Sequence, residues 1–244
     1  MNIGIIGFGY WGTNLVRNFK NIKNCNVTHI AESEVSRHKQ IHELYPDITI
    51  STFDEIIKNS DVDAVVIATH ISSHYELAKA ALENDKHVLV EKPMTSSEKN
   101  AQELIKLSKL KNKILMVDHT YLYSGAVQEI KKSLDANLLG EILYIDSIRA
   151  NLGKFQSDVN VLWDLAPHDI SIINYLINEK PVSVQATGKS YTKNQLENIA
   201  YLILHYESNK IVHVNCSWIS PIKIRTMIIG ASKKMLVFDD LQQK

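Results

Sequence analysis

The sequence has few cysteines, no excess of charge and no long apolar run, and each shortage excludes a class of protein. The 244 residues contain two cysteines, Cys25 and Cys216. Their wide separation fits neither a disulfide framework nor the ligand spacing of a metal site. We therefore predict no metal site, and we expect two reduced thiols in a cytoplasmic protein.

The balance of charge argues against nucleic-acid binding. Lysine plus arginine and aspartate plus glutamate number 27 each, which gives a net charge of zero, whereas proteins that bind a phosphate backbone usually carry a basic excess. No apolar run approaches the roughly 20 residues that a membrane helix needs. The first residues, MNIGIIGFGYWG, have no basic leader, so no signal peptide is expected. We predict neither a nucleic-acid nor a membrane partner.

The first half of the chain alternates strand-like and helix-like segments. Short β-branched runs predict strands at residues 3–6, 27–31, 48–51, 64–68, 87–90 and 114–117. Apolar residues at helical spacing follow Gly12 and recur over 75–82 and 101–108, the last of these behind a capping-box pattern of Thr95 and Glu98. Such alternation is typical of βαβ units and a doubly wound parallel sheet. We place this α/β domain at residues 1–119.

The second half follows a different pattern. Helical spacing runs over 125–134, a strand is expected at 142–148, and a second helix follows Pro167 through Leu176. Strand-like runs then come one after another, at 182–187, 199–205, 211–216, 224–229 and 235–238. Consecutive strands without intervening helices predict an open, mostly antiparallel sheet. We place this α+β domain at residues 120–244.

A glycine-rich loop follows the first strand. In GFGYWG, the first glycine permits a tight turn, the second lets the backbone approach a pyrophosphate, and the third allows the helix to pack closely on the strand. The helix N-terminus that follows offers free N–H groups to phosphate. The loop therefore predicts a Rossmann-type dinucleotide site, lined by Gly7, Phe8, Gly9, Tyr10, Trp11 and Gly12.

An acidic residue at the end of the second strand completes the dinucleotide pattern. Glu32 stands about 20 residues beyond the loop, where a carboxylate accepts hydrogen bonds from the adenosine ribose. A 2′-phosphate would meet like charge, so NAD is favoured over NADP. Ser33 and Arg37 nearby leave room for NADP.

A lysine precedes a proline at the end of the fifth strand. The segment HVLVEKPM places Glu91, Lys92 and Pro93 at the carboxyl end of that strand, the edge where open α/β sheets bind ligands. A lysine there could bind a substrate hydroxyl, and an X-Pro bond can be cis. Taken alone, however, the pattern favours a surface lysine in a turn.

An aspartate and a histidine lie four residues apart in LWDLAPHDISIINYL. If a helix begins near Pro167, which suits a first helical turn, then Asp164 and His168 face the same way. The helix dipole there would favour the neutral imidazole that a general base requires. Asp164 would orient the ring or cap the helix. Spacing alone favours a capping aspartate and a structural histidine.

With these motifs in place, the sequence resembles the glucose-fructose oxidoreductase, inositol dehydrogenase and MocA family, written Gfo/Idh/MocA. The resemblance rests on GFGYWG, on EKP at Glu91–Pro93 and on the DxxxH of Asp164 and His168. The stretch SIRANLGKFQSDVNVLWDLAPHDISII is similar to members that oxidise nucleotide-activated sugars. The resemblance implies a Rossmann domain, an open-sheet α+β domain, and homodimers or homotetramers formed through that C-terminal sheet.

The resemblance also implies an activity. Lys92, Asp164 and His168 would surround a sugar hydroxyl, with His168 taking its proton while hydride passes to NAD, and with Lys92 stabilising the developing alkoxide. Lys92 could instead be the base. Two alternatives stay open, a non-catalytic dinucleotide-binding regulator and an NAD-assisted glycoside hydrolase.

The sequence departs from the family pattern in two places. Family members often have ATP after the fourth strand, where this chain has Ala68, Thr69 and His70. Family chains also generally continue beyond this length, so a truncated chain is expected.

Further residues are weaker candidates. For the cofactor they are Ala68, Thr69, His70, Glu91, Lys92 and His74, which is a site residue or a helix-face histidine. For the substrate they are Tyr121, Arg149, Trp163, Asn151 and Lys154, the last two beside a diphosphate; core or surface roles are equally open.

Overall fold

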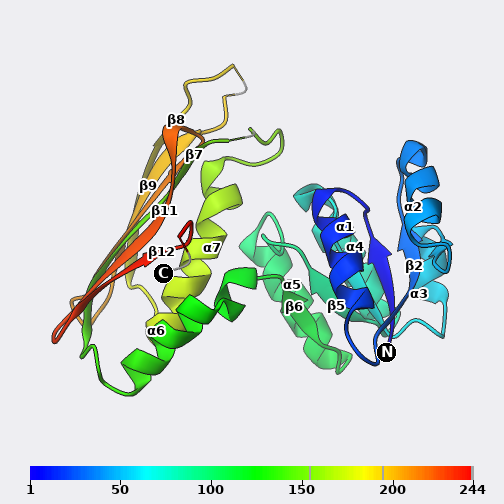
Figure 1. Cartoon of the computed structure of the whole chain (residues 1–244), viewed down its shortest axis with the longest axis horizontal. Coiled ribbons are helices and arrows are strands. Elements are labelled where there is room, and N and C mark those ends of the chain that lie inside the picture. Colours follow the sequence, from blue (N-terminus) through cyan, green and yellow to red (C-terminus); the bar gives the residue numbers. More distant parts are fainter. Residues whose placement is uncertain (154, 194, 243–244) are drawn as a thin grey trace. The chain divides into compact units, whose positions relative to one another are not determined.

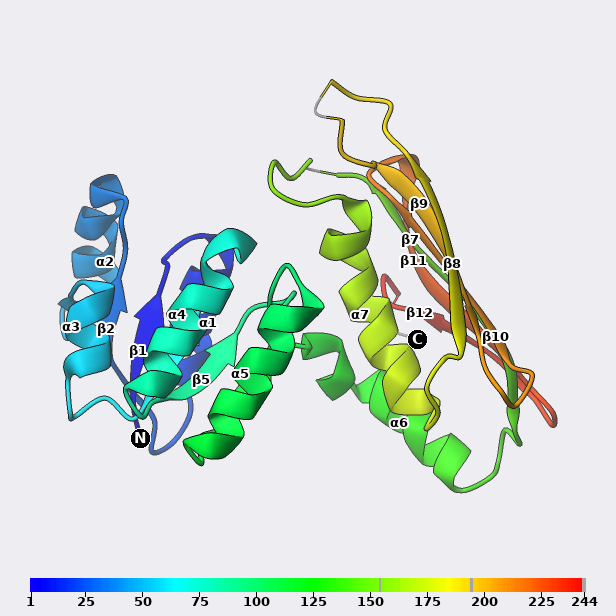
Figure 2. The same cartoon turned by 180° about the vertical axis from the view of Figure 1, so that it is seen from behind.

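The structure is a computed structural model that describes residues 1–153, 155–193 and 195–242. It contains two compact units that divide between Asp118 and His119 (Figures 1 and 2). Each unit has its own sheet and its own hydrophobic core. None of the described helices is long and apolar enough to cross a membrane.

The first unit is a doubly wound parallel sheet, which confirms the predicted fold class. The strand order is β3-β2-β1-β4-β5-β6, and every neighbouring pair is parallel. The strands are β1 (Asn2–Ile6), β2 (Asn26–Ala31), β3 (Thr49–Ile50), β4 (Ala64–Ile67), β5 (His87–Val90) and β6 (Leu115–Val117). The helical segments are α1 (Tyr10–Lys20), η1 (Val35–Arg37), α2 (His38–Leu44), α3 (Phe53–Lys58), α4 (Ile71–Glu83) and α5 (Glu98–Leu110).

Helices cover both faces of this sheet. On one face Val16 of α1 and Ile41 of α2 pack against the sheet, and on the other face α3, α4 and α5 supply a second buried cluster. All four residues of β4 are buried, as an uninterrupted apolar run predicts for a strand covered on both sides.

The second unit is a mixed, mostly antiparallel sheet with helices packed on it, which also confirms the predicted class. The strand order is β12-β11-β7-β10-β9-β8; β7 and β10 run parallel and the other pairs antiparallel. The elements are η2 (Thr120–Tyr123), α6 (Gly125–Asp135), β7 (Ile142–Leu152), α7 (Val161–Leu176), β8 (Ser183–Lys189), β9 (Ile199–His205), β10 (Ile211–Ser217), β11 (Ile219–Ala231) and β12 (Met235–Asp239).

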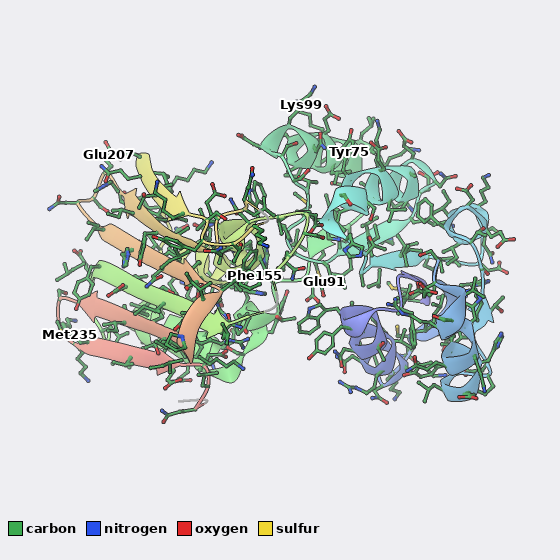
Figure 3. All side chains as sticks on the ribbon, turned by 90° about the horizontal axis from the view of Figure 1, so that it is seen from above. Tyr75, Glu91, Lys99, Phe155, Glu207 and Met235 are labelled. Atoms are coloured by element: carbon green, nitrogen blue, oxygen red, sulfur yellow. The ribbon has the colours of Figure 1, made fainter. Side chains whose placement is uncertain are left out.

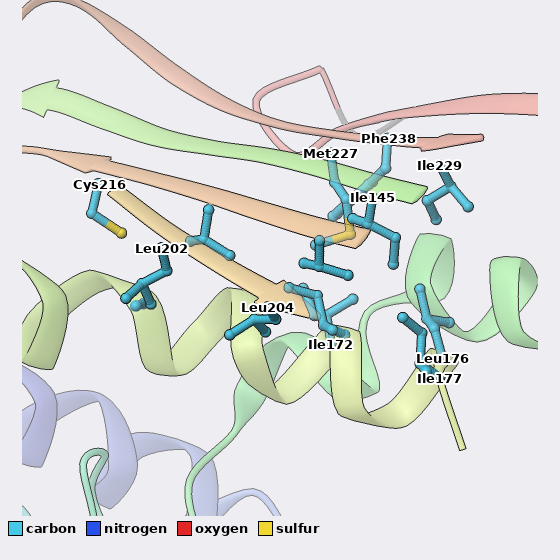
Figure 4. Close-up of a cluster of buried hydrophobic side chains, with 14 of the residues drawn as sticks. Ile145, Ile172, Leu176, Ile177, Leu202, Leu204, Cys216, Met227, Ile229 and Phe238 are labelled. Carbon is cyan, nitrogen blue, oxygen red and sulfur yellow. The ribbon is translucent and has the colours of Figure 1, made fainter. Parts of the chain in front are cut away.

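The core of the second unit lies between the sheet and α6 and α7. Figure 4 shows Ile172 and Leu176 of α7 directed toward Leu202 and Leu204 of β9 and toward Ile145 of β7. Alternate residues of β9 and β10 are buried on this side. The sheet therefore fixes the position of α7, which carries three of the predicted site residues, Trp163, Asp164 and His168.

Two predicted helix starts are wrong. The helix placed after Pro167 begins at Val161, because the Asn160 side chain accepts a hydrogen bond from the Trp163 N–H and caps it there, so Pro167 lies inside α7. The predicted capping box of Thr95 is also replaced. Ser97 caps α5 by accepting from the Asn100 N–H, while the Thr95 hydroxyl donates to the Ser97 carbonyl. The helices α2 and α3 were not predicted.

Candidate functional site

The glycine loop between β1 and α1 has the geometry of a phosphate cradle. Gly7 has a φ of +94°, and a Cβ there would lie 2.6 Å from the carbonyl oxygen of Ala68. A Cβ on Gly12 would lie 2.0 Å from the Gly7 carbonyl oxygen, so the loop closes only with glycine at both positions. At Gly9 a Cβ would meet Arg37 alone, at 3.9 Å. The loop therefore fits the close backbone approach of a dinucleotide pyrophosphate.

The side chains of the loop point to different surroundings. Phe8 is buried and packs edge-on against Tyr45. Tyr10 and Trp11, in the first turn of α1, are exposed and make an edge contact with each other, with ring centroids 5.3 Å apart. Of the predicted cofactor residues in this loop, Phe8 thus serves the core with its ring, and Tyr10 and Trp11 are accessible to a ligand.

Glu32 ties the end of β2 to the glycine loop. Its carboxylate accepts hydrogen bonds from the Phe8 N–H at 2.7 Å, the Glu34 N–H at 2.8 Å and the Arg37 guanidinium at 3.2 Å. Burial raises the pKa of this carboxyl, but the three hydrogen bonds outweigh burial and the pKa is lowered overall. The negative charge that the NAD preference requires is thereby favoured, and the contact with a ribose stays a prediction.

The turn after β4 is fastened to the turn after β5 by a histidine. His74 on α4 is buried, and its Nδ1 and Nε2 lie 2.9 Å and 3.1 Å from the carbonyl oxygens of Pro93 and Thr69. The Thr69 hydroxyl contacts the Ser73 hydroxyl at 2.7 Å, while His70 is exposed. These contacts favour a framework role for His74, the second of the two readings.

Two carboxyl groups lie beside the predicted catalytic lysine. Glu91 follows β5 and is 8% exposed, and its Oε2 accepts from the backbone N–H of Lys92 at 3.2 Å (Glu91 is labelled in Figure 3). Its side chain is hydrogen-bonded to Asp118, which follows β6. Burial first, and then the charge of Asp118, raises the pKa of Glu91 to about 7. Lys92 is half-buried, and its bond to Pro93 is cis.

Asp164 and His168 both lie on α7, one turn apart. The indole N–H of Trp218, which is fully buried, donates to Asp164 Oδ2 at 3.0 Å. The ring of Tyr121 meets the His168 ring edge-on, with centroids 4.8 Å apart. The helix dipole acts mainly within the first turn of a helix. Because α7 begins at Val161, His168 lies beyond that turn. The expected dipole bias toward neutral imidazole therefore does not apply, and Asp164 is not the cap.

Arg149 is held inside the second unit. It is 4% exposed and donates twice to Asp169, from Nε at 2.7 Å and from Nη2 at 3.0 Å. Its guanidinium also stacks on the Tyr121 ring at 4.6 Å. Burial disfavours the charged form, but Asp169 outweighs burial and raises the pKa of Arg149. These contacts favour a structural role for Arg149 over the predicted contact with substrate.

The remaining predicted substrate residues lie near the start of α7. Trp163 is 42% exposed in its first turn, and Asn151 is half-buried near the end of β7. Lys154 lies outside the described residues.

Several partners of the site were missed from the sequence. Asp118 had a usable signal, since it directly follows a strand of the parallel sheet, as Lys92 nearly does. Trp218, Asp169 and Arg225 had none, because each meets its partner through the fold of the second sheet and not through spacing in the sequence.

Two family models match the chain along most of its length. Residues 1–119 match the oxidoreductase family with an NAD-binding Rossmann fold, and residues 127–236 match the GFO/IDH/MocA C-terminal domain. The chain belongs to the Gfo/Idh/MocA family. The resemblance drawn from the glycine loop, EKP and DxxxH is thereby confirmed at the level of the family.

The individual Gfo/Idh/MocA relatives share a third or less of their residues with this chain, or only slightly more. The chain is 35% identical over 152 residues to the uncharacterized oxidoreductase YhhX of Escherichia coli, covering 60% of this chain and 43% of that protein. It is 27% identical over 190 residues to a UDP-N-acetylglucosamine 3-dehydrogenase of Acidithiobacillus ferrooxidans, covering 77% and 58%. The crystal structure of GenD2 from gentamicin A biosynthesis, in complex with NAD, shares the fold with a TM-score of 0.92 at 16% identity, covering 98% and 72%. The chain spans about half the length of the curated relatives it matches.

Proposed function

We propose that this chain acts as an NAD-dependent dehydrogenase on a hydroxyl group of a sugar, and that the sugar is nucleotide-activated. One observation carries the proposal. The glycine loop follows β1 and the Lys92 turn follows β5, and both strands pair in parallel with β4. The phosphate cradle and the lysine therefore lie at the same carboxyl edge of one sheet, which is where open α/β folds bind ligands.

We assign the chemistry to the three side chains of the EKP and DxxxH motifs. NAD, when bound, accepts the hydride. His168 takes the proton of the hydroxyl, and Asp164, one turn away and held by Trp218, orients and polarises it. Lys92 stabilises the negative charge that develops on the oxygen. The alternative, with Lys92 as the base, predicts the same products.

The preference for NAD follows from Glu32. Its lowered pKa favours a carboxylate beside the loop, and the 2′-phosphate of NADP would meet that charge. Arg37 contacts the same carboxylate at 3.2 Å and partly offsets it. We therefore expect NADH to bind more tightly than NADPH. The Glu32→Ala variant should show a smaller difference in affinity between the two nucleotides.

The substrate class is inferred from two sources. One is the stretch from Ser147 to Ile173, similar to members that oxidise nucleotide-activated sugars. The other is a relative that is named a UDP-N-acetylglucosamine 3-dehydrogenase. We further propose a cytoplasmic homodimer or homotetramer formed through the second sheet.

The test begins with titration of the full chain with NADH and, separately, with NADPH. Binding is measured as a change in tryptophan fluorescence, to which Trp11 in the glycine loop contributes. A screen of UDP-sugars with NAD then measures turnover. His168→Asn should lower kcat while NADH affinity holds, and His213→Asn on β10 is the control for losing one imidazole of the same unit. Failure of a folded chain to bind either nucleotide would refute the proposal. Unchanged turnover of the His168 variant would refute the assignment of His168 as the base and favour Lys92 in that role.

A second arm tests whether the lysine and the histidine serve one hydroxyl. Residues that act on the same step have effects that do not add. The Lys92→Met and His168→Asn variants should therefore cost less together than the product of their separate losses in kcat. Simple multiplication of the two losses would assign the residues to independent tasks.

A further inference from the structure

The structure assigns Tyr121 a task that the sequence did not suggest. We infer that Tyr121 is a positioning residue, whose ring fixes the orientation of the His168 imidazole and is itself held by two arginines. This inference rests on the proposed function in so far as it concerns catalysis. The geometry belongs wholly to the second unit.

The Tyr121 ring lies against His168 on one side and Arg149 on another. Its centroid is 4.8 Å from that of the imidazole, with the two planes at 69°, and 4.6 Å from the guanidinium carbon of Arg149. Edge-to-face rings and a cation over a ring face are both favourable arrangements. The imidazole thus rests against a ring that is itself restrained.

The restraint on the ring comes from two arginines that lie opposite each other on adjacent strands of the sheet. Arg149 on β7 is fixed by its two hydrogen bonds to Asp169, the neighbour of His168 on α7. At the other end of the ring, the Tyr121 hydroxyl accepts from Arg225 Nη1 at 2.9 Å, and the same nitrogen lies 3.2 Å from Asp240.

This arrangement connects the sheet to the predicted base. Both Arg149 and Arg225 are on paired strands of one sheet, β7 and β11, so their spacing is set by strand pairing. A base must be held close to the productive geometry, because a misplacement of about 1 Å can cost about a hundredfold in rate. Tyr121 transmits the fixed geometry of the strands to a side chain on the helix.

The experiment compares Tyr121→Phe with Tyr121→Leu in the full chain. Phenylalanine keeps the ring against His168 and loses the hydroxyl with its hydrogen bond from Arg225, whereas leucine removes the ring. Leucine should lower kcat about a hundredfold, and phenylalanine should lower it no more than about threefold. The KM for the sugar and the affinity for NADH should change little in either variant, because a positioning residue contacts neither ligand.

A second readout needs no turnover. The Cε1 proton of His168, assigned by its loss in His168→Asn, should shift in the NMR spectrum of the leucine variant and stay in place in the phenylalanine variant. Tyr201→Leu is the matched control. It removes a ring stacked on His213, at 6.0 Å between centroids, and should move the His213 resonance while leaving kcat unchanged.

Three results would overturn the inference. Equal losses of kcat in the phenylalanine and leucine variants would assign the effect to the hydroxyl. A rise in KM alone would make Tyr121 a substrate contact. An unmoved His168 resonance in a folded leucine variant, checked by circular dichroism, would show that the ring does not set its environment. If the wild-type chain turns over no sugar, the proposed function fails, and the resonances still decide the role of Tyr121.

Discussion

Glu91 makes the stability of the first unit depend on pH in an unusual direction. Its pKa is raised from 4.5 to about 7 in the folded chain, first by burial and then by Asp118. Between these values the folded state keeps a proton that the unfolded state has lost. Stability therefore falls as the pH rises through this range, and the full penalty is present above about pH 7.

The size of the penalty follows from the difference in pKa. Each pKa unit corresponds to about 1.4 kcal/mol, so the rise costs about 3 kcal/mol when both states are ionised. Glu91→Gln removes the ionisable group and can still accept from the Lys92 N–H. We expect the variant to be more stable than the wild type by up to about 3 kcal/mol at pH 8.5, and equally stable at pH 4.

The assay must isolate the first unit, because two units need not unfold together. The chain is equilibrated in urea at each pH and given a short deuterium pulse at one fixed pH, and peptides that contain β5 are read by mass spectrometry. Glu76→Gln, an exposed site on α4, is the control for removing one carboxylate. In the Asp118→Asn variant, the free energy of unfolding should depend less on pH than it does in the wild type. A stabilisation by Glu91→Gln that does not change with pH would refute this reasoning.

Three further changes test the framework around the site. Gly12→Ala places a Cβ 2.0 Å from the Gly7 carbonyl oxygen, so NADH affinity, measured by fluorescence titration, should fall at least about tenfold; unchanged affinity would contradict the cradle geometry. Arg149→Met leaves Asp169 buried and unpaired and should lower the free energy of unfolding in urea by about 3–5 kcal/mol; a loss that Asp169→Asn does not partly restore would argue against the pair. Thr52→Ala removes the cap of α3 and should cost about 1 kcal/mol in thermal unfolding; no loss would mean that tertiary packing alone holds α3.

The parallel sheet was predictable from sequence because its signals are local. The run AVVI of β4 contains no polar residue, and it is buried at every position. The helices α2 and α3 were missed because they are short, with seven and six residues, and short segments show little periodicity. For α3 a signal existed, since Thr52 and Glu55 form a capping box.

The start of α7 shows how two local rules compete. Proline favours a first helical turn, and Pro167 therefore pointed to a helix start that is six residues too late. Asn160 is also a favoured cap, and the burial of Val161 and Ala166 in the core of the second unit stabilises the six additional residues. Tertiary packing decided between two signals that the sequence presents side by side.

The sequence supports predictions of single site residues, which remain predictions, but not of the contacts between them. Lys92, Asp164 and His168 stand in short motifs that can be found by reading along the chain. Tyr121 and Arg225 meet at 2.9 Å although 104 positions separate them, and no spacing rule reaches so far. Candidate reactive groups can therefore be proposed from the sequence, whereas the residues that hold them have to be found in the structure.

The pairing pattern of the second sheet has a consequence for biosynthesis. Strands of the first unit pair through short βαβ connections, so this unit can fold as soon as residue 118 has left the ribosome. The strand β7 lies between β11 and β10, and both of these partners are synthesised after it. Asp146 of β7, for example, contacts His213 of β10, which lies 67 residues downstream. During that interval both edges of β7 lack their partners, and such unpaired edges expose the nascent second unit to pairing with other chains.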